Sequence, residues 1–326
     1  MAAAGVGCSH GRARAAILSP MYDVVIVGGG AAGLSAALVL GRCRRRVLVC
    51  DKGEPRNAAA RAMHGFITRE GTPPSEFLQM AREELKRYPS VELRVCEVTG
   101  AEPLNGGFTV EIAGNHGGHD VQTRILLLAT GMVDELPDIP GLRDFYGTSI
   151  HVCPYCDGWE RRDQALAVFG QGREGFELAV EMRHWSQDIT LCTNGPAEFS
   201  ADELALLEEL RIRLRKEEIE AFVGKGEDLE GITFKDGSTL PCAAAFLSVD
   251  QRQRCELASA LGCKCTETGQ LECSECQATS VPGVYAVGNV AHGLQLVIMA
   301  AADGTQAAFS INEALLDADR PDAEAE

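Results

Sequence analysis

The sequence predicts an α/β protein with two Rossmann-like, three-layer nucleotide-binding domains, the second inserted into the first. Two glycine-rich segments, about 140 residues apart, each lie between an apolar run and a helix-forming run. A late apolar run, 283–288, then precedes a helix expected over 295–316. We expect a flexible extension at 1–20, a discontinuous first nucleotide-binding domain at 21–139 plus 250–326, and a second nucleotide-binding domain, carrying a CxxC pair, at 140–249.

The composition limits the classes of partner. The 326 residues include 30 basic and 47 acidic side chains, a formal net charge of −17. Hydrophobic residues at 45% and charged residues at 24% are ordinary for a globular protein and argue against wholesale disorder. Because this charge repels nucleic-acid phosphates and anionic lipid, we expect neither nucleic acid nor a membrane as a partner.

Two segments invite comparison with membrane or targeting signals. The apolar run 24–40 contains four glycines, which fits a strand, a turn and a helix better than a lipid-exposed span. Residues 1–20 contain only a short apolar stretch, whereas a signal peptide needs a longer one. We therefore expect a cytoplasmic protein.

The first glycine-rich segment has the features of a dinucleotide-binding turn. A buried strand is expected over 22–27 and a helix over 34–42, and a second strand over 46–50 ends at Asp51. Gly28 allows the turn, Gly30 lets the backbone approach a pyrophosphate, and Gly33 lets the helix pack on the strand. The carboxylate of Asp51 is spaced to bind ribose hydroxyls. The predicted cofactor residues here are Gly28, Gly30, Ala31, Ala32, Gly33, Asp51 and Lys52.

The next part of the chain completes the first predicted domain. Residues 56–75 are expected to be irregular, followed by a helix over 75–87 with Ser75 as its N-cap. Strands are expected near 91–97, 107–113 and 121–129, and the last ends in a tight turn at Ala129, Thr130 and Gly131. Pro137, Pro140 and Gly141 indicate a crossing between domains.

A second glycine-rich segment repeats the pattern. A strand over 165–169 leads into Gly170, Gly172 and Gly175, and a helix is expected to end near Trp185. The next strand is expected over 189–192. Two such units indicate a duplicated dinucleotide-binding fold.

A cysteine pair lies between the two glycine-rich segments, in the sequence Cys153-Pro154-Tyr155-Cys156. This spacing lets two thiols form a disulfide, and a helix N-terminus there would lower the thiol pKa. Zinc binding would need two further ligands. Near a βαβ pattern, the pair favours redox chemistry over a metal-binding or structural role.

The order of these motifs resembles the low-molecular-weight thioredoxin reductase family over about 21–316. The resemblance implies FAD on the first glycine-rich segment, a nicotinamide nucleotide (NADP or NAD) on the second, and a homodimer. It implies that Cys153 exchanges with substrate, that Cys156 faces the flavin and that Asp157 is an acid or base. It also adds to the cofactor site Ala129, Thr130, Gly131, Gly288, Asn289, Gln295, Leu296 and Val297.

The chain departs from that family at three places. The basic cluster expected after the second fingerprint is replaced by Thr193-Asn194-Gly195, so neither NADPH nor NADH is specified. The glycine-glycine-glutamine segment beside the flavin is replaced by 57–66, and a late Gly-Asp motif reads Gly288-Asn289. As a neutral side chain, Asn289 can still hydrogen-bond FAD.

These departures resemble a branch that contains the dithiol oxidases of gliotoxin, holomycin and romidepsin biosynthesis. The resemblance implies an enzyme that closes a disulfide in a small-molecule dithiol, with O₂ or NAD(P)⁺ as acceptor. His64 and His151 are candidate bases for the thiols. The alternatives are an NAD(P)H- or ferredoxin-dependent reductase of thioredoxin-like proteins, and a non-enzymatic flavin-binding sensor.

A second cysteine cluster comprises Cys263, Cys265, Cys273 and Cys276 in a predicted hairpin. Free small apolar residues, a second disulfide or redox pair, and a zinc site all fit this spacing. No metal is assigned. The remaining cysteines have no partner at a suggestive spacing and receive no role: Cys8, Cys43, Cys50, Cys96, Cys192, Cys242 and Cys255.

Overall fold

The computed structural model describes residues 21–113 and 119–320. Its first sheet has seven strands in the order β3-β2-β1-β6-β5-β4, with β17 also paired to β6. Strands β1, β2, β3, β6 and β17 are parallel, whereas β4, β5 and β6 form an antiparallel meander. These strands are β1 (Met21–Val27), β2 (Val47–Asp51), β3 (Val91–Val95), β4 (Glu97–Leu104), β5 (Gly107–Ala113), β6 (His119–Leu128) and β17 (Val284–Ala286).

Both faces of this sheet are covered. On one face, α1 (Ala31–Arg42), α2 (Pro74–Leu85) and α8 (Val297–Asp319) pack on side chains such as Val24 and Ile26. On the other face, α7 (Leu257–Ala260) and the segment before β17 pack on side chains such as Val25 and Leu48. Buried apolar residues pointing to both faces explain the continuous apolar run of β1.

The second sheet has five parallel strands in the order β11-β10-β9-β15-β8. They are β8 (Ile150–His151), β9 (Ala165–Phe169), β10 (Asp188–Cys192), β11 (Arg213–Arg215) and β15 (Ala244–Leu247). Helices α5 (Gly172–Met182) and α6 (Ala201–Glu209) pack on one face. An antiparallel sheet of β12 (Ile219–Lys225), β13 (Asp228–Phe234) and β14 (Thr239–Pro241) packs on the other face.

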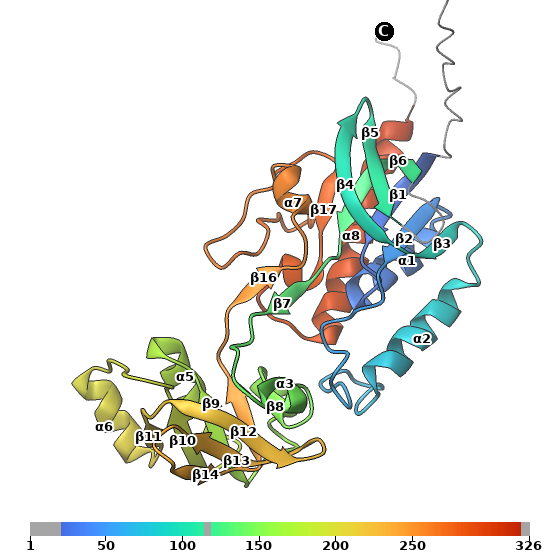
Figure 1. Ribbon diagram of the computed structural model, residues 1–326. Helices are drawn as coiled ribbons and strands as arrows, with labels where there is room; N and C mark the ends of the chain where they lie inside the picture. Colours follow the sequence, from blue (N-terminus) through green and yellow to red (C-terminus); the bar gives the residue numbers. More distant parts are fainter. Residues whose placement is uncertain (1–20, 114–118, 321–326) are drawn as a thin grey trace, which may run out of the picture.

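Two antiparallel strands connect the two sheets: β7 (Met132–Asp134) leads out of the first unit, and β16 (Gln251–Gln253) returns. Figure 1 shows this connector between the two bodies of the molecule, with the short helix α3 (Leu142–Phe145) in the second body. A second short helix, α4 (Pro154–Asp157), follows β8. The predicted fold class is confirmed.

Several expected elements differ in detail. Helix α2 begins one residue earlier than expected, and Ser75 is not its N-cap, because Pro73 occupies that position and Pro74 starts the helix. Strand β4 and the β12–β14 sheet were missed. Within the late apolar run 283–288, only β17 is a strand, and a 3-10 helix, η1 (Gly288–Val290), follows it. Helix α8 runs from Val297 to Asp319, so it ends three residues later than the expected 316.

The predicted extension 1–20, the loop 114–118 and residues 321–326 lie outside the described residues. Among the described residues, no helix has both the length and the apolar character needed to span a bilayer.

Candidate active site

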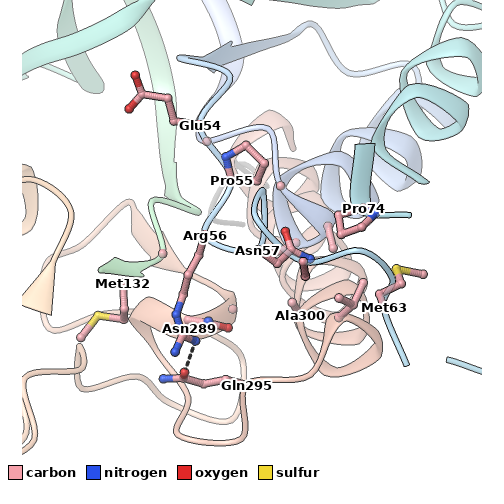
Figure 2. A pocket seen from close by; sticks show the side chains of 18 of the residues that line it. Glu54, Pro55, Arg56, Asn57, Met63, Pro74, Met132, Asn289, Gln295 and Ala300 are labelled. Atoms are coloured by element: carbon pink, nitrogen blue, oxygen red, sulfur yellow. Dashed lines mark hydrogen bonds between the residues drawn. The ribbon is translucent and has the colours of Figure 1, made fainter. Parts of the chain in front are cut away.

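A long cavity of about 570 Å³ runs from the turn after β1 to the cysteine pair of the second unit. Figure 2 shows the part of its wall where Arg56, Asn289 and Gln295 gather. Most of the predicted site residues line this cavity: Gly28, Gly30, Ala31, Ala32, Asp51, Lys52, His64, Ala129, Thr130, Gly131, His151, Cys153, Cys156, Asp157, Gly288, Asn289, Gln295, Leu296 and Val297. The predicted residues outside this lining are Gly33, Gly170, Gly172 and Gly175.

The turn after β1 has the shape expected of a dinucleotide turn. Gly28 has φ +111°, and a Cβ there would lie 2.2 Å from the carbonyl oxygen of Ala129. A Cβ at Gly33 would lie 2.0 Å from the carbonyl oxygen of Gly28, so helix α1 can pack closely on the turn. A Cβ at Gly30 would meet no other atom within 4 Å, so this residue faces open space. A phosphate can therefore approach the backbone at Gly30.

Two helices begin at this cavity without a side-chain cap. Gly30 is the N-cap of α1 and Leu296 is the N-cap of α8, and neither makes a side-chain capping hydrogen bond. The first N–H groups of a helix lack partners within the helix and carry a partial positive charge. The two helix starts therefore suit the anionic and carbonyl oxygens of a dinucleotide.

Asp51 is the last residue of β2 and lines the cavity. Its Oδ1 accepts a hydrogen bond from the backbone N–H of Gly53 at 3.1 Å, and its Oδ2 lies 2.8 Å from a guanidinium nitrogen of Arg82. Arg82 comes from α2 and also lines the cavity, although sequence reasoning missed it. The carboxylate is therefore held in place next to the turn, where it fits a ribose hydroxyl.

The cysteine pair forms a disulfide in the structure, with its Cα atoms 5.3 Å apart. Cys153 is the N-cap of α4, and its Sγ accepts a hydrogen bond from the backbone N–H of Cys156 at 3.2 Å. Both cysteines line the same cavity as the turn after β1. The cavity therefore joins this disulfide to the turn where a dinucleotide fits.

Two histidines lie near the disulfide in different settings. His151 is buried, its side chain 5% exposed, and its Nδ1 lies 3.2 Å from Oδ1 of Asp157. Its Nε2 is buried with no hydrogen-bond partner among the described residues. The His151 ring therefore orients the carboxylate that follows Cys156.

His64 lies on the cavity wall contributed by the first unit. Its Nδ1 lies 2.6 Å from Oε1 of Glu70, and its Nε2 lies 3.8 Å from Oε1 of Glu160. Hydrogen bonds from His64 and from the backbone N–H of Gly65 lower the pKa of Glu70. Because a carboxylate only accepts hydrogen bonds, Nδ1 carries the proton in the contact with Glu70.

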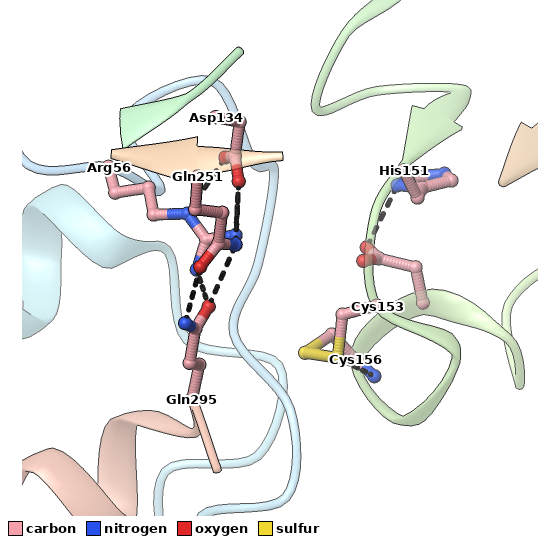
Figure 3. The surroundings of a disulfide bond; sticks show 8 residues. Arg56, Asp134, His151, Cys153, Cys156, Gln251 and Gln295 are labelled. Atoms are coloured by element: carbon pink, nitrogen blue, oxygen red, sulfur yellow. Dashed lines mark hydrogen bonds and ion pairs between the residues drawn. A yellow bond between two sulfur atoms is a disulfide. The ribbon is translucent and has the colours of Figure 1, made fainter. Parts of the chain in front are cut away.

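A polar cluster that the sequence did not reveal lies on the connector between the units (Figure 3). Arg56 binds Asp134 through two nitrogens, at 2.6 and 2.8 Å, and the hydroxyl of Tyr146 donates to Asp134 at 2.5 Å. Gln251 donates to Asp134 at 2.9 Å, and Gln295 donates to Gln251 at 2.6 Å. We call these five residues the connector cluster.

The connector cluster keeps Asp134 ionised although its side chain is 4% exposed. Burial acts to raise the pKa of Asp134, but hydrogen bonds and charge from Arg56, with hydrogen bonds from Tyr146 and Gln251, outweigh it and leave the pKa lowered. Burial and the bond to Asp134 raise the pKa of Tyr146. The cluster joins the loop after β2, both connector strands, the second unit and the start of α8.

The second glycine-rich turn has tight packing but different surroundings. A Cβ at Gly170 would lie 2.6 Å from the Cα of Gly175, and Gly172 has φ +54°. The side chain of Gln171 donates to the carbonyl of Thr193 at 3.1 Å, and Asn194 Oδ1 accepts from the N–H of Ile219 at 2.7 Å. The two side chains that follow β10 are thus uncharged and do not specify a ribose or its 2′-phosphate.

The second cysteine cluster contains free thiols. Cys263 is buried, Cys273 is partly buried, and Cys265 and Cys276 are exposed. Within the described ranges, no group of three or more His, Cys, Asp or Glu side chains is arranged to hold a metal ion. The structure thus gives no support to the zinc alternative for these cysteines.

Comparison with protein families matches residues 22–304 to the pyridine nucleotide-disulphide oxidoreductases. Thioredoxin reductase tcpT of Claviceps purpurea is 31% identical over 83% of this chain and 87% of its own length. A probable thioredoxin reductase of Arthroderma benhamiae is 36% identical over 190 residues, which are 57% of this chain and 46% of that protein. The chain therefore spans less than half of that second relative.

Solved structures give the same result. The crystal structure of HlmI has a TM-score of 0.86 and 38% identity, covering 91% of this chain and 93% of that one. An oxidoreductase from Agrobacterium tumefaciens has a TM-score of 0.85 and 33% identity, covering 91% and 99%. The expected resemblance to thioredoxin reductase-like proteins is confirmed. The chain belongs to the pyridine nucleotide-disulphide oxidoreductase family and is an FAD-dependent oxidoreductase of the thioredoxin reductase type.

Proposed function

We propose that the protein is a dithiol oxidase that forms an intramolecular disulfide in a small-molecule dithiol. The observation that carries this proposal is the Cys153–Cys156 disulfide on the wall of the cavity that fits FAD. The uncharged end of β10 gives only weak support for a nicotinamide nucleotide as the usual electron source. The disulfide supplies the thiol–disulfide chemistry, and the uncharged end of β10 favours electron flow from a dithiol towards the cofactor.

The exchange needs two successive attacks. One thiolate of the substrate attacks Sγ of Cys153, which breaks the disulfide and releases Cys156 as a thiolate. The second substrate thiol then attacks the mixed disulfide, so the cyclic product leaves and both cysteines are reduced. Two electrons and two protons have moved from the substrate to the cysteine pair. When bound, FAD supplies a two-electron acceptor for this pair, with O₂ or NAD(P)⁺ as the final acceptor.

The chain's own acid–base groups suit these steps. His64 lines the cavity and Glu70 holds the proton on its Nδ1, so Nε2 can take the proton of a substrate thiol. A free thiol has a pKa of about 8.5, so a base increases the thiolate fraction at neutral pH. Asp157, oriented by His151, lies next to Cys156 and can exchange a proton with it.

One observation favours a second function, reduction of thioredoxin-like proteins. Tyr155 and Trp159 flank the disulfide and are 68% and 65% exposed. Exposed aromatic side chains of this kind are common at protein-binding surfaces. A protein disulfide docked there would accept electrons from the cysteine pair.

Two further properties belong to this proposal. Ten of the described cysteines are free, which suits a reducing compartment such as the cytoplasm. Phe309 and Leu316 lie seven residues apart on α8 and are 62% and 50% exposed, which suits a homodimer contact. Light scattering of wild type and Phe309→Glu tests the dimer, because the variant is expected to be monomeric.

Aerobic turnover tests the function directly. Oxygen consumption is measured with a small 1,4-dithiol, and NADPH oxidation is measured with a disulfide-form thioredoxin. We expect oxygen consumption that depends on the dithiol and little NADPH oxidation. Rapid NADPH oxidation that depends on thioredoxin, without dithiol oxidation, would establish the reductase instead.

A further inference from the structure

The segment 263–273, which we call the cysteine hairpin, carries Cys263 and Cys273 at its two ends. An antiparallel bridge pairs Cys265 with Leu271. The N–H of Thr266 donates to the carbonyl of Gln270 at 2.8 Å, and that of Glu272 donates to Lys264 at 2.9 Å. Two residues further along each strand, on the same face of the hairpin, this register pairs Cys263 with Cys273.

This pair occupies a position that favours a disulfide. The two hydrogen bonds flank the Cys265–Leu271 pair and end the ladder there, since the N–H of Lys264 donates to Oγ of Ser280 at 2.9 Å. Extended by one more pair of the same face, this register sets Cys263 opposite Cys273 as a pair whose members are not hydrogen-bonded to each other. Residues opposed at such positions have Cα atoms about 4.5 Å apart and side chains close together. A disulfide needs Cα atoms about 4.4–6.8 Å apart, so the bond fits without moving the backbone far.

Contacts of the side chains agree with this register. Sγ of Cys263 lies 3.7 Å from Oγ1 of Thr279, and an antiparallel bridge pairs Thr279 with Cys273. Burial, with a smaller contribution from the nearby thiol of Cys263, raises the pKa of Cys273 to about 11. Burial also raises the pKa of Cys263. Both thiols are therefore protonated at neutral pH, and the pair stays reduced until an oxidant reaches it.

The cysteine hairpin also supports the cavity wall. The N–H of Leu271 donates to the carbonyl of Val290 at 2.7 Å. Val290 directly follows Gly288 and Asn289, which line the cavity. A covalent bond across the hairpin would hold this segment more firmly.

We propose that Cys263 and Cys273 are a second redox-active dithiol, which small-molecule disulfides convert into a cross-strand disulfide. Cys273, the more exposed of the two, attacks the small disulfide and releases one thiol. Cys263 then attacks the mixed disulfide and releases the second thiol. Two protein thiols are oxidised and one small disulfide is reduced to two thiols, so electrons and protons balance. This site is separate from Cys153 and Cys156.

Disulfide mapping tests the pairing. The Cys153→Ser/Cys156→Ser holoenzyme is reduced, freed of reductant, treated with glutathione disulfide, alkylated and digested with trypsin. Cleavage after Lys264 separates Cys263 from Cys273, so their disulfide appears as two linked peptides. We expect this linkage in Cys265→Ser and its loss in Cys263→Ser. Linkage of Cys265 to Cys276, glutathione adducts alone, or four alkylated thiols would overturn the proposal.

Thermal unfolding gives an independent measurement. Closing a short loop with a disulfide stabilises the folded state, and we expect oxidation to raise the melting temperature by about 5 °C. The rise should be retained in Cys276→Ser, whose thiol is exposed, and absent in Cys273→Ala. An equal rise in Cys273→Ala, or no rise in Cys276→Ser, would contradict a bond between Cys263 and Cys273. Neither result depends on turnover, so the proposed function is tested separately.

Discussion

The two glycine-rich turns share one spacing but open onto different surroundings. After β1, the turn faces a cavity of about 570 Å³ that ends at the disulfide, and Asp51 stands at the end of the next strand. In the second unit, the strand that follows the turn, β10, ends before Thr193 and Asn194, whose side chains bond the backbone groups of Gly195 and Ile219. The glycines set the backbone of a turn, whereas the neighbouring side chains decide which ligand fits it.

The largest expected effect concerns the chemistry at the first cavity. Cys156→Ser removes the disulfide, so turnover of a small dithiol should fall by about 10³-fold or more. FAD content should stay unchanged. Cys43→Ser, at an exposed cysteine of the same protein, serves as the control and should retain wild-type turnover. Substantial turnover by Cys156→Ser would show that the reaction does not require this disulfide.

The connector cluster tests whether the two units depend on each other. Asp134→Asn leaves Arg56 without its charged partner and should lower the free energy of unfolding at pH 7 by about 3 kcal/mol. The pKa of Asp134 in the folded protein lies below its ordinary value of 3.8. The ionised carboxylate therefore contributes its full stabilisation above pH 3.8, and the contribution is lost as the pH falls through the lower pKa of the folded protein. Denaturant unfolding between pH 3 and 7 measures the difference, and a constant difference would contradict the account.

His64 tests the acid–base part of the site. His64→Gln should lower turnover at pH 7 by about 30-fold, since a general base contributes factors of about 10²–10⁴ and part of the thiolate forms without help. The deficit should shrink as pH approaches the thiol pKa of about 8.5. A pH profile of kcat/KM for both proteins checks this. A deficit independent of pH would assign His64 a structural role.

The smallest expected effect separates the two glycine-rich turns most cleanly. Gly30→Ala places a methyl in the open space at the first turn and should weaken FAD binding about tenfold while the apoprotein melts normally. Gly172→Ala strains a residue with φ +54° by about 1 kcal/mol and should leave FAD content unchanged. Flavin content per chain and thermal melts distinguish the two variants. Equal loss of FAD from the two variants would contradict the proposal that only the first turn binds FAD.

Local features were the ones the sequence could predict. Gly28 and Gly33 lie where the turn requires them, and Cys153 with Pro154 starts a short helix, because these features depend on neighbours in the chain. Strand β4 was missed because Gly100 and Pro103 weaken a strand pattern, although a strand at the edge of a sheet tolerates them. Ser75 was misjudged as a cap because Pro74 already starts the helix.

Contacts between distant segments left no pattern in the sequence. Arg56 and Asp134 are 78 residues apart, and Arg56 and Gln295 are 239 apart. Neither pairing follows a helical or strand period, so only the fold reveals the connector cluster. The same reason hid the ion pair of Asp51 with Arg82.

The most direct test of the central claim is the colour of the bound flavin without oxygen. The purified holoenzyme is mixed anaerobically, in separate experiments, with a small dithiol, NADPH and NADH, and the flavin's visible absorbance is followed. The account predicts rapid bleaching by the dithiol, little by either nicotinamide nucleotide, and return of the colour with air. Bleaching by NADPH within the mixing time, with the colour restored by oxidised thioredoxin, would contradict it.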